Sequence, residues 1–330
     1  MLQIVVIGYR NHAARVINIL CEMVSIKSVL VYHPDSKKTE VLFKDSHFKI
    51  QYTSSWDSLI NADAFFICSP SETHKDYISK ILDIANEKNS LPYIYCEKPP
   101  GISISELNWL KNKSQILYKK LYFGFNYRFS SLNIQIKKTI ESGKLGLPIY
   151  ANFTVSHGLA FKKGISGNWR FSDSSIFSKI TGNLGVHYVD MCINLFGSIK
   201  NVSITERNIA KNKQPDTAII NLFFESGMIC NIFLSYATVF SQTADIFFSN
   251  GLLKEDNFKI DIFSPRDTFN KHNEFCQPKA FHLDQNYEIK NSKSGLNESI
   301  NYFMTKVEKG SFFNLREYDM SLNATEIFLE

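Results

Sequence analysis

The chain has 330 residues, of which 44% are hydrophobic and 21% charged, and this length and composition predict a folded protein of two domains rather than one. Its net charge of +5 comes from basic residues scattered along the chain. The continuous basic face of a nucleic-acid groove is therefore excluded, and only a mild attraction for anionic substrates such as nucleotide phosphates remains. No apolar run approaches the roughly 18 residues that a membrane span needs.

The cysteines and the first residues bear on the compartment. Six cysteines fall singly, with no Cys-x-x-Cys pair, which argues against a disulfide framework and against a zinc site. The opening Met-Leu-Gln-Ile-Val-Val-Ile-Gly lacks a basic segment, and its apolar stretch is too short for a signal peptide. We therefore expect a reduced, cytoplasmic protein.

Short apolar runs alternate with amphipathic helical segments over the first third of the chain. Runs that are apolar on both faces and separated by helices are typical of a parallel sheet covered on both sides. The expected strands are 3–7, 28–32, 64–68, 93–96 and 121–125. This alternation predicts a doubly wound dinucleotide-binding domain, a Rossmann fold, over residues 1–124.

From about residue 145 the pattern changes to strands with few helices between them. The expected strands are 149–156, 202–206, 217–224, 228–237, 247–253 and 258–263, framed by helices at 133–142, 186–195, 299–308 and 318–328. Ser226-Gly227 has the composition of a hairpin turn. Residues 125–330 are therefore predicted to form an α+β domain on an open, largely antiparallel sheet, which makes the whole chain an α/β protein.

The loop after the first predicted strand reads Gly8-Tyr9-Arg10-Asn11-His12-Ala13, where dinucleotide-binding proteins carry Gly-x-Gly-x-x-Gly/Ala. Gly8 suits the tight turn, and Ala13 is an accepted substitute for the third glycine. Arg10 replaces the second glycine, where a side chain crowds the phosphates, although its guanidinium adds charge beside a helix N-terminus that attracts anions. By itself this loop is weak evidence, because many turns between a strand and a helix contain one glycine.

The end of the second predicted strand is where such proteins usually hold the adenosine ribose with a carboxylate. His33 occupies that position here, with Asp35 two residues later and Lys37-Lys38 beyond. A histidine and two lysines in place of an acid favour a 2′-phosphate and hence NADP. An exposed polar turn is an equal alternative, so the expected cofactor is NADP or NAD.

Two distant segments together suggest acid/base chemistry. Glu97-Lys98-Pro99 closes the apolar run 93–96, and the proline keeps Lys98 extended at a strand end, where parallel sheets bind ligands. Much later the chain reads Asn183-Leu-Gly-Val-His187-Tyr-Val-Asp190. A histidine, whose ordinary pKa is about 6.5, suits proton exchange at neutral pH. A surface lysine and a core histidine are the structural alternatives, and Asp190 is expected to cap or orient.

The motifs together resemble the glucose–fructose oxidoreductase, inositol dehydrogenase and rhizopine-catabolism (Gfo/Idh/MocA) family over nearly the whole chain. Glu97-Lys98-Pro99 resembles the most specific short motif of that family. The other matching segments follow in the family's order: Trp56–Leu59, Asp63–Pro70 with Thr73-His74, Gly124–Phe129, Gly143–Gly146, Trp169-Arg170, Gly185–Asp190 and Phe224–Gly227. A series of matches in one order is not expected by chance.

The resemblance implies a two-domain NAD(P)-dependent oxidoreductase that holds its substrate between the cofactor and the open sheet. In this family a lysine and a histidine lie on either side of the reacting hydroxyl or ketone. These two positions correspond to Lys98 and His187. The aspartate that usually precedes the histidine by four residues is Asn183 here. Because an amide cannot accept a proton, proton transfer would fall on His187, Lys98 or a bound water.

Binding roles follow from the same resemblance. The implied substrate-binding residues are Asn183, Tyr127, Arg128, Trp169 and Arg170. Bracing of the domain junction is an equal alternative for Tyr127 and Arg128. Trp169-Arg170 would stack on a sugar or base and bind a phosphate, with a structural role as a nearly equal alternative. The implied cofactor-binding residues are Gly8, Arg10, Asn11, His33, Ser69, Pro70, His74, Glu97 and Lys98. Of these, His74 and Glu97 would position either the ribose or the loop around the nicotinamide.

The sequence thus predicts an NAD(P)-dependent oxidoreductase acting on a hydroxyl or keto carbon of a sugar, with a nucleotide-linked sugar of surface-polysaccharide synthesis as one candidate. The alternative is a non-catalytic relative that binds a sugar or nucleotide, because Arg10, His33 and Asn183 all depart from the family pattern. A purely structural protein has no support beyond the open sheet. That sheet suggests a homodimer or homotetramer, and no nucleic-acid or membrane partner is expected.

Overall fold

The computed structural model describes residues 1–35, 50–165, 171, 176–282 and 292–329. Contacts within the chain divide it into two compact units, of which unit 1 comprises Met1–Phe125 with Asn297–Glu330 and unit 2 comprises Asn126–Leu296. The expected second domain, 125–330, included the C-terminal residues, whereas the observed contacts group them with unit 1. Among the described residues, no helix combines the length and the apolar character needed to cross a membrane.

Unit 1 is built on a parallel sheet. In the described residues its strands are β1 (Leu2–Ile7), β2 (Ile26–Tyr32), β3 (Ile50–Thr53), β4 (Ala64–Ile67), β5 (Tyr93–Cys96) and β6 (Leu121–Phe123). They lie in the order β3-β2-β1-β4-β5-β6, with every neighbouring pair parallel. The predicted Rossmann architecture is confirmed. Only β3 was not expected, because its residues are exposed or partly buried and form no continuous apolar run.

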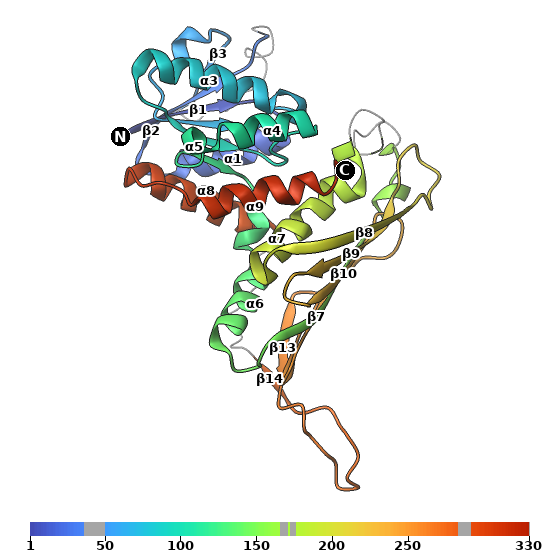
Figure 1. Cartoon of the computed structure of the whole chain (residues 1–330). Helices are drawn as coiled ribbons and strands as arrows, with labels where there is room; N and C mark the ends of the chain where they lie inside the picture. The colour runs from blue at the N-terminus through green and yellow to red at the C-terminus, as the bar shows by residue number, and fades with distance from the viewer. Residues whose placement is uncertain (36–49, 166–170, 172–175, 283–291, 330) are drawn as a thin grey trace. The chain divides into compact units, whose positions relative to one another are not determined.

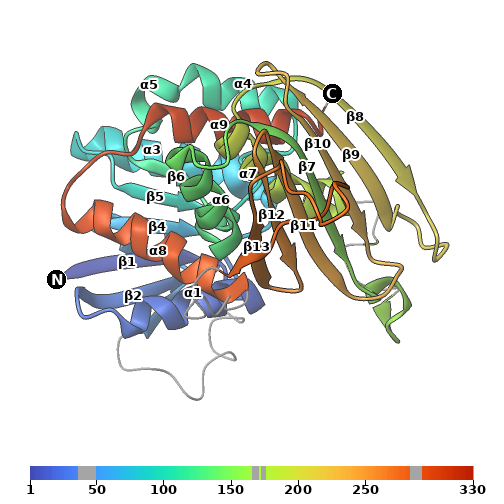
Figure 2. The same ribbon diagram turned by 90° about the horizontal axis from the view of Figure 1, so that it is seen from below.

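Helices cover this sheet (Figure 2). Those described in or partly in unit 1 are α1 (Asn11–Glu22), α3 (His74–Lys88), α4 (Ile104–Asn112), α5 (Ser114–Leu117), α8 (Ser292–Glu308) and α9 (Leu315–Glu326). The start of α4 is set by Ser103, whose Oγ accepts a hydrogen bond from the backbone N–H of Glu106 at 3.3 Å. This is the N-cap interaction that a serine three residues before a glutamate favours.

An aromatic cluster explains why the C-terminal helices belong to unit 1. The ring of Phe303 on α8 lies 5.0 Å from that of Phe66 and 5.5 Å from that of Tyr95, centroid to centroid. The hydroxyls of Tyr95 and Ser299 are hydrogen-bonded at 3.1 Å. Each large side chain buried in this way stabilises the fold by roughly 1.5–3 kcal/mol, so residues 297–329 complete the core of unit 1.

Unit 2 is built on an open, mixed sheet (Figure 1). Its described strands are β7 (Pro148–Ser156), β8 (Ile199–Arg207), β9 (Thr217–Phe224), β10 (Ile229–Ser235), β11 (Ser241–Phe248), β12 (Gly251–Asp256), β13 (Lys259–Phe263) and β14 (Ala280–His282). They lie in the order β14-β13-β12-β11-β7-β10-β9-β8, and β7 with β10 is the parallel pair in this otherwise antiparallel sheet. The predicted, largely antiparallel sheet is confirmed.

One face of this sheet is covered by α7 (Val186–Phe196), and unit 2 also contains α6 (Ser131–Ser142). On the covered face, Tyr188 of α7 packs against Phe153 with ring centroids 5.7 Å apart. On the opposite face, neighbouring strands align one apolar residue each, in what we call the apolar row: Phe223, Ile229, Tyr150, Phe247, Leu252 and Phe263. Two positions away along each of these strands, on the same face, lies a row of polar residues: Asn221, Asn231, Asn152, Asp245, Lys254 and Asp261.

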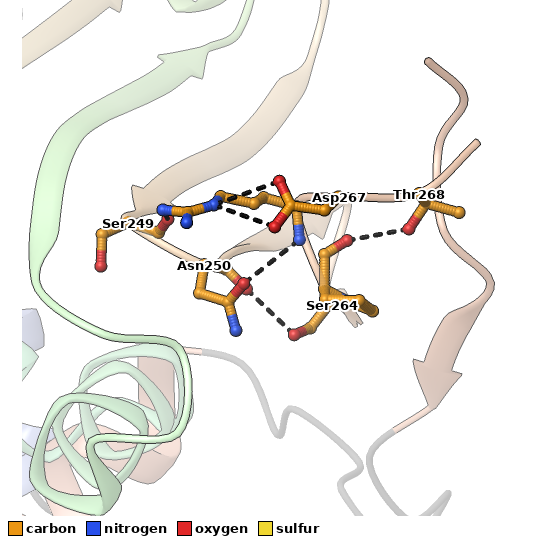
Figure 3. Close-up of polar contacts among 7 residues, drawn as sticks. Ser249, Asn250, Ser264, Asp267 and Thr268 are labelled. Carbon is orange, nitrogen blue, oxygen red and sulfur yellow. Dashed lines mark hydrogen bonds and ion pairs between the residues drawn. The ribbon is translucent and has the colours of Figure 1, made fainter. Parts of the chain in front are cut away.

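Between β13 and β14 the chain leaves the sheet as an extended arm, residues 264–279 (orange in Figure 1). At the base of the arm, the Ser264 hydroxyl donates to the carbonyl oxygen of Asn250 at 2.9 Å, as Figure 3 shows. Further out, the rings of Phe269 and Phe275 pack with centroids 4.6 Å apart. The arm is therefore tied to the turn between β11 and β12 and closed on itself by an aromatic pair.

A buried carboxyl lies inside unit 2. Glu255 on β12 is 1% exposed, between Ala244 of β11 and Ile260 of β13. Burial raises the pKa of Glu255 to about 7, against hydrogen bonds from the Gln242 side chain and the Phe258 backbone. A carboxyl with a raised pKa keeps its proton in the folded protein at pH values where the unfolded chain has released it. Its contribution to stability is therefore lost as the pH rises from about 4.5 toward 7.

We predict that Glu255→Gln flattens the pH dependence of stability. As the pH rises from 5 to 8, loss of the proton from this carboxyl should lower the free energy of unfolding of the wild type by up to about 3 kcal/mol, since one pKa unit corresponds to about 1.4 kcal/mol. Urea unfolding across that range measures the difference. Glu225→Gln, at an exposed turn position, is the control and should keep the wild-type slope. Equal slopes in all three proteins would contradict the assignment.

Candidate functional site

The parallel sheet gathers the expected cofactor residues at one edge. Gly8 follows β1, His33 follows β2, Ser69 lies shortly after β4, and Glu97 and Lys98 follow β5. Because the strands run in one direction, their carboxyl ends lie along the same edge of the sheet. The strand order reverses between β1 and β4, and α/β sheets bind ligands outside the carboxyl ends of the strands at such a reversal.

Gly8 makes a turn that requires glycine. Its φ is +115°, and a Cβ at this position would lie 2.9 Å from the carbonyl oxygen of Cys68. Its backbone N–H donates to the carbonyl oxygen of Tyr32 at 3.1 Å. Helix α1 begins three residues later at Asn11, so unpaired N–H groups of its first turn lie near the turn and can bind an anion. The local geometry is that of a dinucleotide-binding turn.

Arg10 does not fill this turn. It is the N-cap residue of α1, with extended backbone and an exposed side chain that makes no capping hydrogen bond. Ala13, at the third glycine position, is 1% exposed and packs between helix and sheet as the motif requires. The residues present therefore fit a bound dinucleotide, with the guanidinium adding positive charge beside the helix N-terminus.

His33 occupies the ribose position at the end of β2. Its Nδ1 accepts a hydrogen bond from the backbone N–H of Asp35 at 3.0 Å and lies 3.3 Å from the carbonyl oxygen of the same residue. The ring of Tyr9 meets His33 edge-on, with centroids 4.6 Å apart. The Lys37-Lys38 pair lies outside the described residues.

Glu97 has a partner that the sequence did not suggest. The Glu97 side chain is 13% exposed, and its Oε1 lies 2.6 Å from Nε2 of His12, in the second position of α1. Burial by itself would raise the pKa of Glu97, but His12, Lys98 and His74 outweigh burial and hold the pKa below its ordinary value. Glu97 is therefore an ionised carboxylate next to Lys98. The only sequence signal for His12 was its place inside the nucleotide loop.

His74 lies behind the same turn. It is 1% exposed, with Nδ1 2.9 Å from the carbonyl oxygen of Pro99 and Nε2 3.1 Å from that of Ser69. Burial lowers the pKa of His74 more than these two carbonyl contacts and the nearby Glu97 raise it. A neutral ring has one N–H and donates to one of these two carbonyl oxygens, and its position between them packs the loop after β4 against the loop after β5. Of the two roles expected for His74, this geometry favours positioning of the loop over contact with a ribose.

In unit 2 the expected substrate residues lie around the start of α7. Asn183 belongs to the π-helical turn Thr181–Gly185, and His187 lies four residues later in the first turn of α7, so both side chains point to one side. The ring of Tyr127 stacks on His187 with centroids 4.5 Å apart. Asn183 Nδ2 donates to the hydroxyl of Tyr236 at 3.1 Å.

Two further residues join this group without any sequence signal. Tyr236 is 3% exposed, and its ring stacks on His157 with centroids 4.9 Å apart. Burial, with a smaller contribution from Tyr236, raises the pKa of Tyr127 to about 12, so the Tyr127 phenol stays protonated at neutral pH. Unit 2 therefore presents a cluster of imidazole, amide and phenol groups that suits the hydroxyls of a polyol.

Arg128 is engaged inside unit 2. Its Nη2 lies 2.5 Å and its Nε 2.8 Å from the two carboxylate oxygens of Asp190, and the two side chains are 7% and 0% exposed. This bidentate pair fixes α7 to the segment that precedes α6, so Arg128 and Asp190 together brace the fold of unit 2. Trp169 and Arg170 lie outside the described residues. Within the described ranges, no three His, Cys, Asp or Glu side chains gather as a metal site would require.

Comparison with known proteins identifies the family. A family model described as "Oxidoreductase family, NAD-binding Rossmann fold" matches residues 2–125, and one described as "GFO/IDH/MocA C-terminal domain" matches residues 134–254. The chain belongs to the Gfo/Idh/MocA oxidoreductase family. The two matched ranges correspond to the Rossmann sheet of unit 1 and to most of the sheet of unit 2, and they confirm the resemblance drawn from the motifs.

Relatives of this Gfo/Idh/MocA protein include glucose-6-phosphate 3-dehydrogenase of Bacillus subtilis, 27% identical over 66% of this chain and 59% of that protein. The chain spans about three-fifths of the length of the first curated relatives it matches. Its fold is similar to that of a myo-inositol dehydrogenase from Corynebacterium glutamicum (TM-score 0.74, 20% identity, 100% and 96% of the two chains). It is also similar to an oxidoreductase from Agrobacterium radiobacter in complex with NAD+, L-tartaric acid and magnesium (TM-score 0.75, 16% identity, 99% and 94%).

We predict that Asp190→Asn destabilises the protein by about 3–5 kcal/mol, because it leaves the buried Arg128 guanidinium without its counter-charge. Urea unfolding measures the loss. The double variant Arg128→Met with Asp190→Leu should recover part of it, since no uncompensated charge then remains. A loss below about 1 kcal/mol, the range of exposed pairs, would show that the ion pair does not brace α7.

Proposed function

We propose that this protein is an NAD(P)-dependent oxidoreductase that moves hydride between its cofactor and a hydroxyl or keto carbon of a sugar or cyclic polyol, nucleotide-linked sugars included. One observation carries the proposal: the glycine-only turn at Gly8 and the Glu97-Lys98-Pro99 segment lie at the same edge of a Rossmann sheet. The relatives named for glucose 6-phosphate and myo-inositol support the substrate class. The net charge of +5 supports an anionic, phosphate-bearing substrate.

The cofactor would be held by the turn at Gly8, the first turn of α1 and the Arg10 guanidinium. A bound nicotinamide supplies the hydride acceptor or donor, and the protein supplies orientation and electrostatics. We favour NADP over NAD, because His33 stands at the ribose position where a carboxylate would repel a 2′-phosphate. The contact between Asp35 and His33 is made by the backbone N–H of Asp35. This contact therefore does not place the Asp35 carboxylate at the ribose position.

The proton that leaves or joins the reacting oxygen falls to Lys98 or His187. Both residue types exchange protons readily when partly buried. Asn183 donates its amide to Tyr236 and cannot accept a proton, so it binds and orients. Tyr127, stacked on His187, limits the rotation of that imidazole and so keeps its nitrogens in a fixed direction.

A non-catalytic sugar- or nucleotide-binding protein is the second candidate, favoured by Asn183, which replaces the family's usual aspartate. The structure weakens the other two reasons for this candidate. The Arg10 side chain is exposed and the turn at Gly8 keeps its glycine-only backbone, and His33 is compatible with NADP. Lys98 and His187 are both retained, which a protein without catalysis does not require.

We predict that the protein binds NADPH more tightly than NADH and oxidises or reduces at least one member of a panel that includes myo-inositol, glucose 6-phosphate and nucleotide-linked sugars. Lys98→Met and His187→Asn should each lower kcat by about 10²–10⁴-fold, the usual contribution of a general acid or base. Nicotinamide fluorescence measures binding, and the change in NAD(P)H absorbance measures turnover.

Lys27→Met provides the matched control, because Lys27 is an exposed lysine near the amino end of β2. It should bind cofactor and turn over like the wild type. Cofactor binding without turnover of any panel member, and with no effect of Lys98→Met on binding, would favour the non-catalytic candidate. Absence of binding by a folded protein would refute both the proposed cofactor and the proposed reaction.

We further propose that the apolar row of unit 2 is covered by a second copy of this chain, giving a homodimer or homotetramer. Phe223, Ile229 and Phe247 in this row are 38%, 42% and 43% exposed. Contiguous apolar patches of this kind mark association surfaces in water-soluble proteins. The row crosses successive strands in nearly a straight line, so a two-fold axis through it places row against row, as an isologous contact requires.

Phe223→Glu combined with Phe247→Glu should therefore convert the oligomer to monomers, because charges placed in a desolvated contact are costly. Light scattering coupled to gel filtration measures the mass. Ile116→Glu, at a position in α5 that is 56% exposed, serves as the control and should leave the mass unchanged. A monomeric wild type would show that this face is not an interface between copies.

A further inference from the structure

The hydrogen bonds around His12 define its protonation. Arg15 Nη2 lies 3.0 Å from His12 Nδ1, and His12 Nε2 lies 2.6 Å from Glu97 Oε1. A guanidinium can only donate, so Nδ1 of His12 must accept. Nε2 therefore carries the ring proton and donates it to the Glu97 carboxylate. The three side chains form a directed chain of hydrogen bonds that runs from the exposed surface of α1 to the turn after β5.

The partners of the Glu97-Lys98-Pro99 turn lie on both sides of Lys98. On one side His12 binds the carboxylate of Glu97, and on the other His74 contacts the carbonyl oxygen of Pro99 at 2.9 Å. Lys98 itself is partly buried between these two contacts. A hydrogen bond to a charged group is stronger than one between neutral groups, so the His12 contact is the stronger restraint of the two.

We propose that His12 is a positioning residue for Lys98: by holding Glu97 it fixes the turn that carries the lysine, and it ties this turn to the helix that begins the nucleotide loop. The proposal rests on the proposed oxidoreductase function, in which Lys98 acts on the reacting oxygen. It adds a residue that acts through Glu97 and not on the substrate. The binding of a dinucleotide at the start of α1 and the position of Lys98 thereby depend on the same contact between His12 and Glu97.

A structural contribution of His12 to α1 alone would have different consequences. Every His12 variant would then lose the contact with Arg15 on α1, whether or not Glu97 is also changed. In contrast, a residue that acts through Glu97 should have little further effect once Glu97 can no longer accept a charged hydrogen bond. A double-mutant cycle separates the two cases, because residues that act through one shared contact are not additive.

The test compares His12→Leu, His12→Gln, Glu97→Gln and the double variant His12→Leu with Glu97→Gln. His12→Leu should lower kcat by about ten- to hundredfold with little change in the KM for cofactor, as expected for loss of a hydrogen bond to a charged group. His12→Gln, whose amide reaches as far as Nε2, should recover most of the loss. The double variant should be no slower than the slower single variant. Asn18→Ala, on the exposed surface of the same helix, should match the wild type.

A second readout needs no turnover. Amide hydrogen exchange, followed by mass spectrometry in the absence of substrate, should be about tenfold faster in the peptide 93–103 of His12→Leu than of the wild type, while the peptide covering β4 stays unchanged. Unchanged exchange in 93–103 would overturn the proposal, as would additive effects in the cycle. Weaker NADPH binding as the sole effect of His12→Leu would instead make His12 a direct cofactor ligand and would also overturn it. If the wild type turns over no substrate, the proposed function fails, and hydrogen exchange still decides whether His12 holds the turn.

Discussion

The common direction of the strands in unit 1 is the constraint on which the candidate cofactor site depends. Because β1, β2, β4 and β5 end at one edge of the sheet, the loops that follow them are neighbours in space although they are far apart in sequence. The reversal of strand order beside β1 then leaves room for a ligand at that edge. Gly8 and the turn at Lys98 therefore lie at one edge of the sheet because of the strand direction. Side-chain contacts such as that of His12 refine a geometry that the backbone has already set.

Much of the fold follows from the sequence because burial leaves a periodic trace. The runs 3–7, 64–68 and 93–96 are apolar on both faces, and this pattern fits a parallel sheet between helices. The alternation of buried and exposed positions expected for 217–224 predicted a strand of an antiparallel sheet in the same way. The place of the C-terminal helices did not follow, since an amphipathic pattern shows that a helix buries one face but not against which sheet. Contacts of Phe303 with Phe66 and Tyr95, more than 200 residues away in sequence, decide it.

The site was predictable where a residue belongs to a short motif and not where tertiary contacts define its role. Lys98, His187 and Gly8 could be named as candidates because their neighbours in sequence form recognisable patterns. Tyr236 and His157 have no such neighbours, and His12 has only its place in the nucleotide loop, so each gains its role from a residue on another element. Arg128 shows the converse limit: the motif drew attention to it, but only its buried pairing with Asp190 indicates that it supports the fold. Charge and position in a motif do not reveal whether a side chain already has a partner.

The division of the chain has a consequence for its architecture as a folding unit. Unit 1 is discontinuous, because Asn126–Leu296 is inserted between β6 and the helices that complete the core around Tyr95 and Phe303. No single cleavage can release an intact Rossmann half, and a fragment that stops at Phe125 would expose the aromatic surface that those helices cover. Synthesis from the N-terminus therefore leaves the nucleotide-binding half incomplete until the segment from Asn297 onward emerges. Loss of α9 would remove the contact of Tyr318 with Phe123 on β6, the strand that neighbours β5 and the turn at Lys98.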